Sequence, residues 1–179
     1  MNSWPDLAVT HSQTLRFFFE RLRDVIDVDD TPVSELLYNA SILAHFASTS
    51  SASTDRFPPC PTSLTGVFDV FVLDRSQQSD PEIMEAAGSQ CLFMTGFFQD
   101  QLRRRHNVGW YAALGATFFD RAAQRSHDRA RTRMLATMAL RFEFWRRQQR
   151  RLAHELRDHP WAIPGGPDDP GAAPREPSR

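Results

Sequence analysis

Residues 91–119 read CLFMTGFFQDQLRRRHNVGWYAALGATFF and predict two helices that pack closely as a hairpin. An apolar segment ends at an arginine triplet, a short turn follows, and a second apolar segment begins near Val108. Both segments place small residues among large aromatic ones, and Gly96 and Gly115 are the smallest of them. A glycine inside a helix costs about 1 kcal/mol relative to alanine. We therefore expect the close approach of a neighbouring helix to offset that cost at Gly88 and Gly96, and the two helices of the hairpin to pack closely around Gly96 and Gly115.

The rest of the chain predicts an all-α, single-domain bundle of about six helices. Thr31-Pro32 and Asp80-Pro81 are typical helix starts, a capping residue followed by proline. Residues 64–74 fit a helix face, which we favour, although their β-branched and aromatic content also suits a strand. The helical domain is predicted to span 1–157, and the Pro- and Gly-rich residues 158–179 are predicted to be a disordered tail. Apolar residues recur at helical spacing in 8–27, 31–47, 81–104, 108–125 and 127–157.

The predicted C-terminal helix, residues 127–157, is the longest and carries a narrow apolar seam. Seven positions fall at alternating spacings of three and four, as the a and d positions of a coiled coil do, and only Gln149 among them is polar. Such a seam packs either inside the bundle or against a second copy of the chain. The candidate interface consists of Leu135, Met138, Phe142, Trp145, Leu152 and Leu156.

Charge is divided along the chain. The 21 cationic residues are all arginine, and the formal net charge is only −1. Residues 1–100 hold 5 Arg against 14 acidic residues, whereas residues 101–157 hold 14 Arg against 4. The two halves either face each other or leave a basic surface for an acidic partner such as nucleic acid. The candidate basic patch consists of Arg103, Arg104, Arg105, Arg146, Arg147, Arg150 and Arg151.

The sequence also limits the compartment. No apolar run approaches the length of about 18 residues that a membrane span needs. The first residues lack a basic segment followed by an apolar one, so no secretory signal is predicted. Cys60 and Cys91 are 31 positions apart and do not indicate a disulfide framework. These features predict a cytoplasmic protein without a membrane association.

No arrangement of residues predicts catalysis or a metal. The six histidines are scattered singly, and neither Glu-x-x-His nor Gly-x-Ser-x-Gly occurs. Cys60-Pro61 is a weak haem signal, better explained as a stiff loop. We therefore predict no cofactor and no catalytic residue, although an apolar ligand between the helices 81–104 and 108–125 is an alternative.

Two segments resemble a known family. Residues 92–123 contain Leu92-Phe93, Gly96-Phe97-Phe98, the triplet 103–105, Trp110-Tyr111 and Leu114-Gly115. This pattern is similar to the core of an uncharacterised family of bacterial all-helical proteins of about 200 residues, against 179 here. Residues 36–49 resemble the second helix of that family. At the position of Trp110-Tyr111, proteins of the family usually have Tyr-Tyr. The resemblance implies a helical bacterial domain and no activity.

The leading functional hypothesis is a non-enzymatic, cytoplasmic interaction or regulatory module that self-associates. Two alternatives stay open: a nucleic-acid-binding protein that uses the arginine-rich face, and a sensory bundle that binds an apolar ligand or cofactor.

Overall fold

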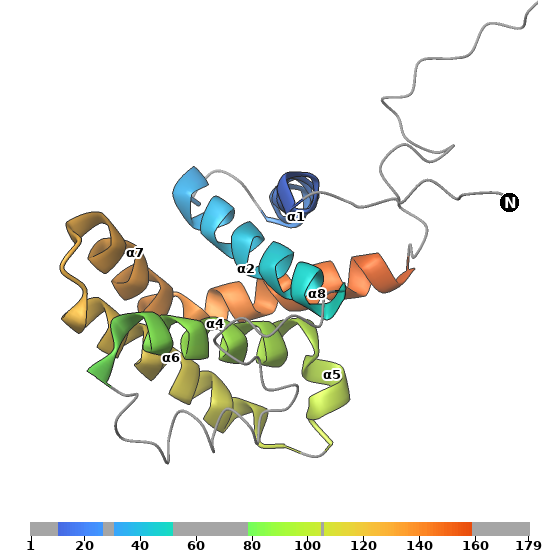
Figure 1. Cartoon of the computed structure of the whole chain (residues 1–179). Helices are drawn as coiled ribbons and strands as arrows, with labels where there is room; N and C mark the ends of the chain where they lie inside the picture. Colours follow the sequence, from blue (N-terminus) through green and yellow to red (C-terminus); the bar gives the residue numbers. More distant parts are fainter. Residues whose placement is uncertain (1–10, 27–30, 52–78, 105, 159–179) are drawn as a thin grey trace, which may run out of the picture.

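The computed structural model describes residues 11–26, 31–51, 79–104 and 106–158, and within these ranges the chain is helical with no strand. The prediction of an all-α bundle is confirmed. Residues 64–74 and the predicted tail after residue 158 lie outside the described residues. The described helices are α1 (His11–Val25), α2 (Val33–Ser51), α4 (Pro81–Phe97), α5 (Gln99–Leu102), α6 (Val108–Arg125), α7 (Arg129–Leu140) and α8 (Phe142–Asp158) (Figure 1).

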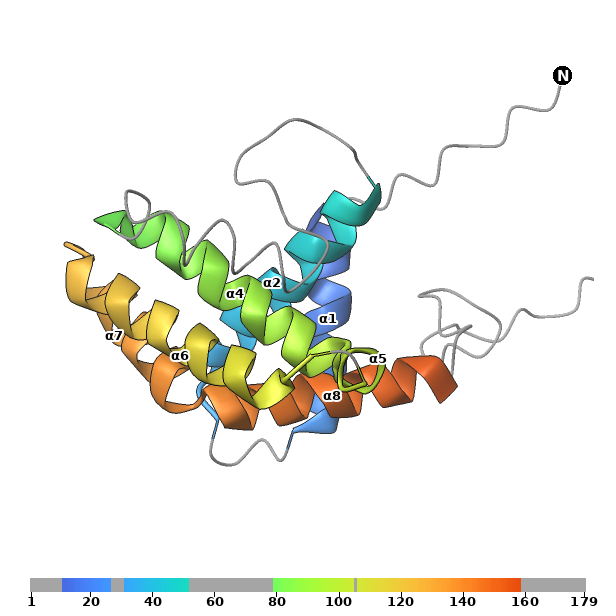
Figure 2. The same ribbon diagram turned by 90° about the horizontal axis from the view of Figure 1, so that it is seen from below.

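The helices form two groups on opposite sides of α8. The pair α1 and α2 lies on one side, and α4 and α6 lie on the other (Figure 1). Seen from below, α4, α6 and α7 run side by side (Figure 2). Helix α8 contacts both α1 and α4 and so links the two groups. The groups also meet directly where α2 contacts α4.

Polar side chains cap three helices at their starts. The Asp80 carboxylate accepts hydrogen bonds from the first backbone N–H groups of α4, at 2.8 and 3.4 Å. Asn107 caps α6 through the backbone N–H of Trp110 at 3.1 Å, and Asp128 caps α7 at 2.7 and 3.2 Å. Each cap satisfies backbone donors that have no partner inside the helix. The start of α4 agrees with the prediction from Asp80-Pro81.

Two predicted helices are interrupted. The helix predicted for 81–104 breaks at Phe98, where α4 gives way to α5. The helix predicted for 127–157 breaks at Arg141 (φ −99°, ψ 16°), so α7 and α8 replace one long helix. Arg141 lies at this break with its guanidinium 3.0 Å from Glu35 of α2 and 4.4 Å from the ring centre of Phe144. The described part of the chain consequently has seven helices, where about six were predicted for the whole chain.

Close packing occurs at the glycines of α4 and α6. A methyl group at Gly115 would lie 2.6 Å from both Cys91 Cβ and Phe142 Cζ. One at Gly96 would lie 3.0 Å from Gln149 Cβ on α8. The expectation that neighbouring helices approach closely at these two glycines is confirmed.

The apolar seam lies inside the chain. Leu135, Met138, Trp145 and Leu152 are fully buried, and Phe142 is 3% exposed. Leu156 is partly buried and packs against the same core. The first five side chains have no surface to offer a second copy, so their role as a candidate interface is corrected to that of an intramolecular core. Among the helices that the structure describes, none combines the length and apolar character needed to cross a membrane.

Candidate functional site: a cavity between α2 and α4

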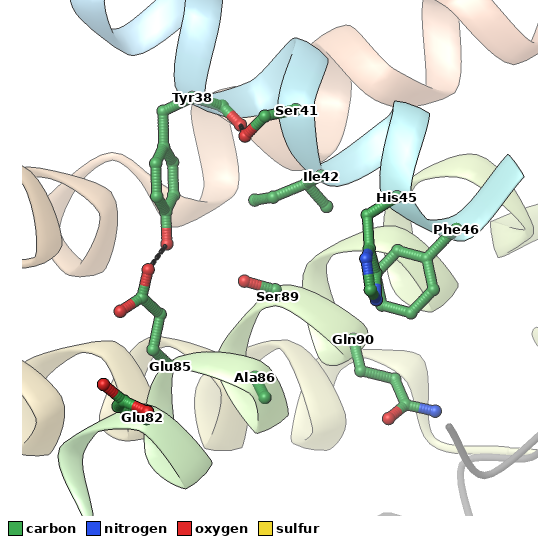
Figure 3. Close-up of a pocket in the computed structure, with 10 residues that line it drawn as sticks. All are labelled: Tyr38, Ser41, Ile42, His45, Phe46, Glu82, Glu85, Ala86, Ser89 and Gln90. Carbon is green, nitrogen blue, oxygen red and sulfur yellow. Dashed lines mark hydrogen bonds between the residues drawn. The ribbon is translucent and has the colours of Figure 1, made fainter. Parts of the chain in front are cut away.

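A cavity of about 270 Å³ lies at the boundary between α2 and α4 (Figure 3). Each helix contributes one face, because its lining residues follow the spacing i, i+3, i+4, i+7 and i+8. The lining residues are Tyr38, Ser41, Ile42, His45 and Phe46 from α2, and Glu82, Glu85, Ala86, Ser89 and Gln90 from α4.

One end of the cavity is polar and joins three helices. The Tyr38 hydroxyl donates a hydrogen bond to Glu85 Oε1 at 2.8 Å across the boundary (Figure 3). Arg131 of α7 donates through Nε to Glu85 Oε2 at 2.8 Å, and its Nη2 lies 2.6 Å from the same oxygen. Glu82 is further away, with its Oε1 4.0 Å from Arg131 Nη1. Glu85 therefore connects α2 to α7 through α4.

The environment shifts the pKa of two groups that line the cavity. Burial raises the pKa of Tyr38 well above its ordinary value of 10.0, and the negative charge of Glu85 raises it further. Burial lowers the pKa of His45 below 6.5, and His11 adds a smaller effect in the same direction. Near neutral pH, Tyr38 consequently keeps its proton and His45 is mostly uncharged.

The rest of the lining combines apolar and polar side chains. Ile42 and Phe46 of α2 and Ala86 of α4 are apolar, and at the end away from Tyr38 the Phe46 ring lies beside His45 and opposite Gln90 (Figure 3). Phe46 is 6% exposed and stacks on Phe93 of α4, with ring centres 4.5 Å apart and planes 9° from parallel. An apolar wall with a few convergent polar groups is the usual composition of a small-molecule site.

A buried polar cluster fixes α2 on α8 behind the cavity. Glu35 accepts hydrogen bonds from Arg141 Nη1 at 3.0 Å and from Trp145 Nε1 at 3.1 Å. One helical turn further, Asn39 Oδ1 accepts a hydrogen bond from Gln149 Nε2 at 3.4 Å. Because Glu35 lies one turn before Tyr38 and Asn39 directly follows it, this cluster positions the start of the α2 wall.

Two of the candidate arginines lie at the junction of α5 and α8. Arg150 lies 2.9 Å from Asp100 of α5, and Arg146 donates to Gln99 of α5 at 2.8 Å and to Glu143 at 2.8 Å and 2.6 Å. The side chains of Arg103, Arg104, Arg147 and Arg151 are exposed, and Arg105 lies outside the described residues. The structure therefore brings Arg146 and Arg150 together at α5, where two carboxylates offset their charge.

The two cysteines and the histidines do not form a second site in the part of the chain that the structure describes. Burial raises the pKa of the Cys91 thiol to about 12, which leaves it protonated and unreactive. Cys60 lies outside the described residues. No group of three or more metal-binding side chains occurs in the part of the chain that the structure describes.

The cavity was not predicted from the sequence. The alternative of an apolar ligand between the helices 81–104 and 108–125 concerned the other side of α4, where the Phe119 ring of α6 lies 3.0 Å from the position that a methyl at Gly88 would take. The cavity instead lies on the α2 side of α4. The signal was the polar set Glu82, Glu85 and Ser89 at helical spacing, hidden in a helix that is otherwise apolar nearly all round.

No protein-family model, curated protein or solved structure matches this chain. The similarity of residues 92–123 to a bacterial family therefore stays a prediction.

Proposed function

We propose that this chain is a cytoplasmic, ligand-binding regulatory module whose α2–α4 cavity holds a small amphipathic molecule. The observation that carries the proposal is the composition of the cavity. Tyr38 and Glu85, with Arg131 paired to Glu85, form a polar end, and the apolar side chains of Ile42 and Phe46 line the cavity beyond it. A molecule with one polar head and a short apolar body satisfies both ends.

The position of the cavity supports a regulatory role. The cavity lies between α2, which belongs to one group of helices, and α4, which belongs to the other, so a ligand in it would contact both groups. A ligand that binds only the folded chain stabilises it by mass action, by about 2.7 kcal/mol at a concentration one hundred times its Kd. Bridging would therefore favour one relative placement of α2 and α4.

The test is a thermal-shift screen of small amphipathic molecules with two matched variants. Ala86→Phe places a ring in the cavity, whereas Ala113→Phe adds the same ring at an exposed position of α6. We expect ligands that raise the Tm of the wild type and of Ala113→Phe but not of Ala86→Phe. A flat screen, or stabilisation that survives Ala86→Phe, would contradict the proposal.

A second candidate, self-association as an interaction module, is favoured by exposed apolar side chains away from the seam. Val33 and Leu37 of α2 are 66% and 47% exposed, and Leu140 at the end of α7 is 88% exposed. The Glu35–Arg141 ion pair joins these two helix ends. Exposed apolar groups near one junction are typical of a contact surface.

Native mass spectrometry over a concentration series tests this second candidate. We expect a dimer for the wild type, and weaker dimerisation for Leu140→Glu because a carboxylate would be buried in the contact. Ala113→Glu, at an exposed position of another helix, serves as the control. A wild-type chain that stays monomeric at high concentration would exclude self-association.

A further inference from the structure

We infer that the α2–α4 cavity selects a small organic cation, an ammonium head on a short apolar body. The inference rests on the proposed ligand-binding function and adds the chemical class of the ligand. Its basis is the direction of the hydrogen bonds at the polar end of the cavity together with the charges and the size of that cavity.

The two hydroxyl donors of α2 at the polar end are already used within the protein. The Tyr38 hydroxyl donates to Glu85, and the Ser41 hydroxyl donates to the Tyr38 carbonyl at 2.7 Å. Arg131 donates through Nε to the other oxygen of Glu85. A carboxylate offers about four lone-pair sites, and Glu85 engages one oxygen with Tyr38 and the other with Arg131. Acceptor capacity therefore remains at the polar end, and a ligand head that donates hydrogen bonds matches it.

The charges favour a cationic donor over a neutral one. Glu82 and Glu85 line the cavity, and Arg131 is the cation paired with them. His45, the other titratable side chain on the α2 face besides Tyr38, is mostly uncharged near neutral pH because burial lowers its pKa. Two carboxylates against one guanidinium leave an excess negative charge, which attracts an ammonium group and repels a carboxylate or phosphate.

The size of the cavity limits the apolar body. A volume of about 270 Å³ corresponds to roughly nine water molecules at about 30 Å³ each. It lies just below the range of about 300–1,000 Å³ that is usual for drug-sized ligands. A single ring with a short arm fits this space.

Three probes of nearly equal size test the class of ligand. Benzylammonium is the cation, benzyl alcohol is the neutral donor and benzoate is the anion. Calorimetric or NMR titration of the full chain is expected to give an affinity for benzylammonium at least tenfold above that for benzyl alcohol, and no saturable binding of benzoate. Raising the ionic strength should weaken the benzylammonium affinity, because salt screens partly exposed charges.

Glu82→Gln is the variant that tests the charge. Its side chain is 78% exposed and lies 4.0 Å from its cation, so the substitution should leave the fold intact. Removing one unit charge near the ligand head should weaken benzylammonium binding about fivefold, and it should leave benzyl alcohol binding unchanged. The matched control is Glu155→Gln on the exposed surface of α8, where neither affinity should change.

The outcomes separate the class of ligand from the proposed function. Binding of benzyl alcohol or benzoate as tight as that of benzylammonium, lost in Ala86→Phe, would overturn the cation inference and keep the cavity as the site. Failure of all three probes to bind would also overturn the inference, and the broader screen would then decide the proposed function by itself. A benzylammonium affinity unaffected by Glu82→Gln and Ala86→Phe would place the binding elsewhere and overturn the inference.

Discussion

Replacing Gly115 with alanine is expected to destabilise the fold by about 2 kcal/mol. The added methyl would lie 2.6 Å from Cys91 Cβ and from Phe142 Cζ, and 2.8 Å from Phe142 Cε2. Carbon atoms prefer separations of about 3.5–4.0 Å, so the methyl overlaps two groups by roughly 1 Å. Cys91 is fully buried and Phe142 is 3% exposed, so neither can move into solvent. Extra methyl groups in a packed core cost about 1–3 kcal/mol, and two simultaneous overlaps favour the upper part of that range.

The gain in helix propensity opposes this cost without cancelling it. Alanine is favoured over glycine in a helix interior by about 1 kcal/mol, which reduces a core cost of about 3 kcal/mol to a net loss of about 2 kcal/mol. Gly109 offers a matched control in the first turn of the same helix. A methyl there would meet only Asn107 Oδ1, at an ordinary distance of 3.6 Å, and the residue is exposed. Gly109→Ala should therefore stabilise the fold, by no more than about 1 kcal/mol.

Urea denaturation followed by circular dichroism measures both changes. The same chemical substitution in one helix should change the free energy of unfolding in opposite directions. The double variant Gly115→Ala with Phe142→Leu should lose less stability than the two single changes added together, because the leucine removes ring atoms that meet the methyl. Equal effects of Gly115→Ala and Gly109→Ala would refute the close approach of α4, α6 and α8 at Gly115.

Three further changes have defined outcomes. Glu35→Ala should lower the free energy of unfolding by about 3 kcal/mol, because the guanidinium and indole donors beside it lose their buried acceptor; a loss below about 1 kcal/mol in chemical denaturation would contradict a structural role. In a Cys60→Ser background, Cys91 should resist thiol reagents at pH 8, because burial raises its pKa to about 12, and should react once the chain is unfolded; rapid labelling of the native chain would show that the thiol is accessible. In a Tyr111→Phe background, ultraviolet titration should place the ionisation of Tyr38 well above pH 10, because burial and Glu85 both disfavour the phenolate; a midpoint at pH 10 would mean that Tyr38 is solvated.

The close packing at the glycines was predictable from the sequence. A glycine lowers the stability of its own helix, so a contact with another helix has to offset that loss. Gly96 and Gly115 interrupt good helix-forming sequence, so a neighbouring helix had to approach them. The breaks at Phe98 and Arg141 were not predictable by the same reasoning. Neither residue disfavours a helix strongly, and Arg141 meets its partner Glu35 across 106 positions of sequence. Contacts between residues so far apart produce no periodic pattern in the sequence from which a helix break could be predicted.

The candidate site was predictable in part. Each wall of the cavity follows helical spacing, so the residues on each face could be grouped from the sequence alone. The pairing of α2 with α4 could not, because it depends on how α8 holds the two groups of helices. The arginine patch shows the same limit: its members were identified, but the carboxylates of Asp100 and Glu143 that offset them became evident only from the packing of α5 on α8.

The hydrogen bonds that hold α2 on α8 also impose an order on synthesis. Glu35 meets Trp145, and Asn39 meets Gln149, across 110 positions of sequence. At about 5–20 residues per second, a ribosome needs on the order of 5–20 seconds to add that much chain. Throughout this interval the apolar faces of α1 and α2 lack the helix that covers them, and the Glu35 carboxylate stays in water. Folding of the N-terminal pair during translation is therefore delayed until α8 has been made, and chaperones that bind exposed apolar segments have that interval in which to act.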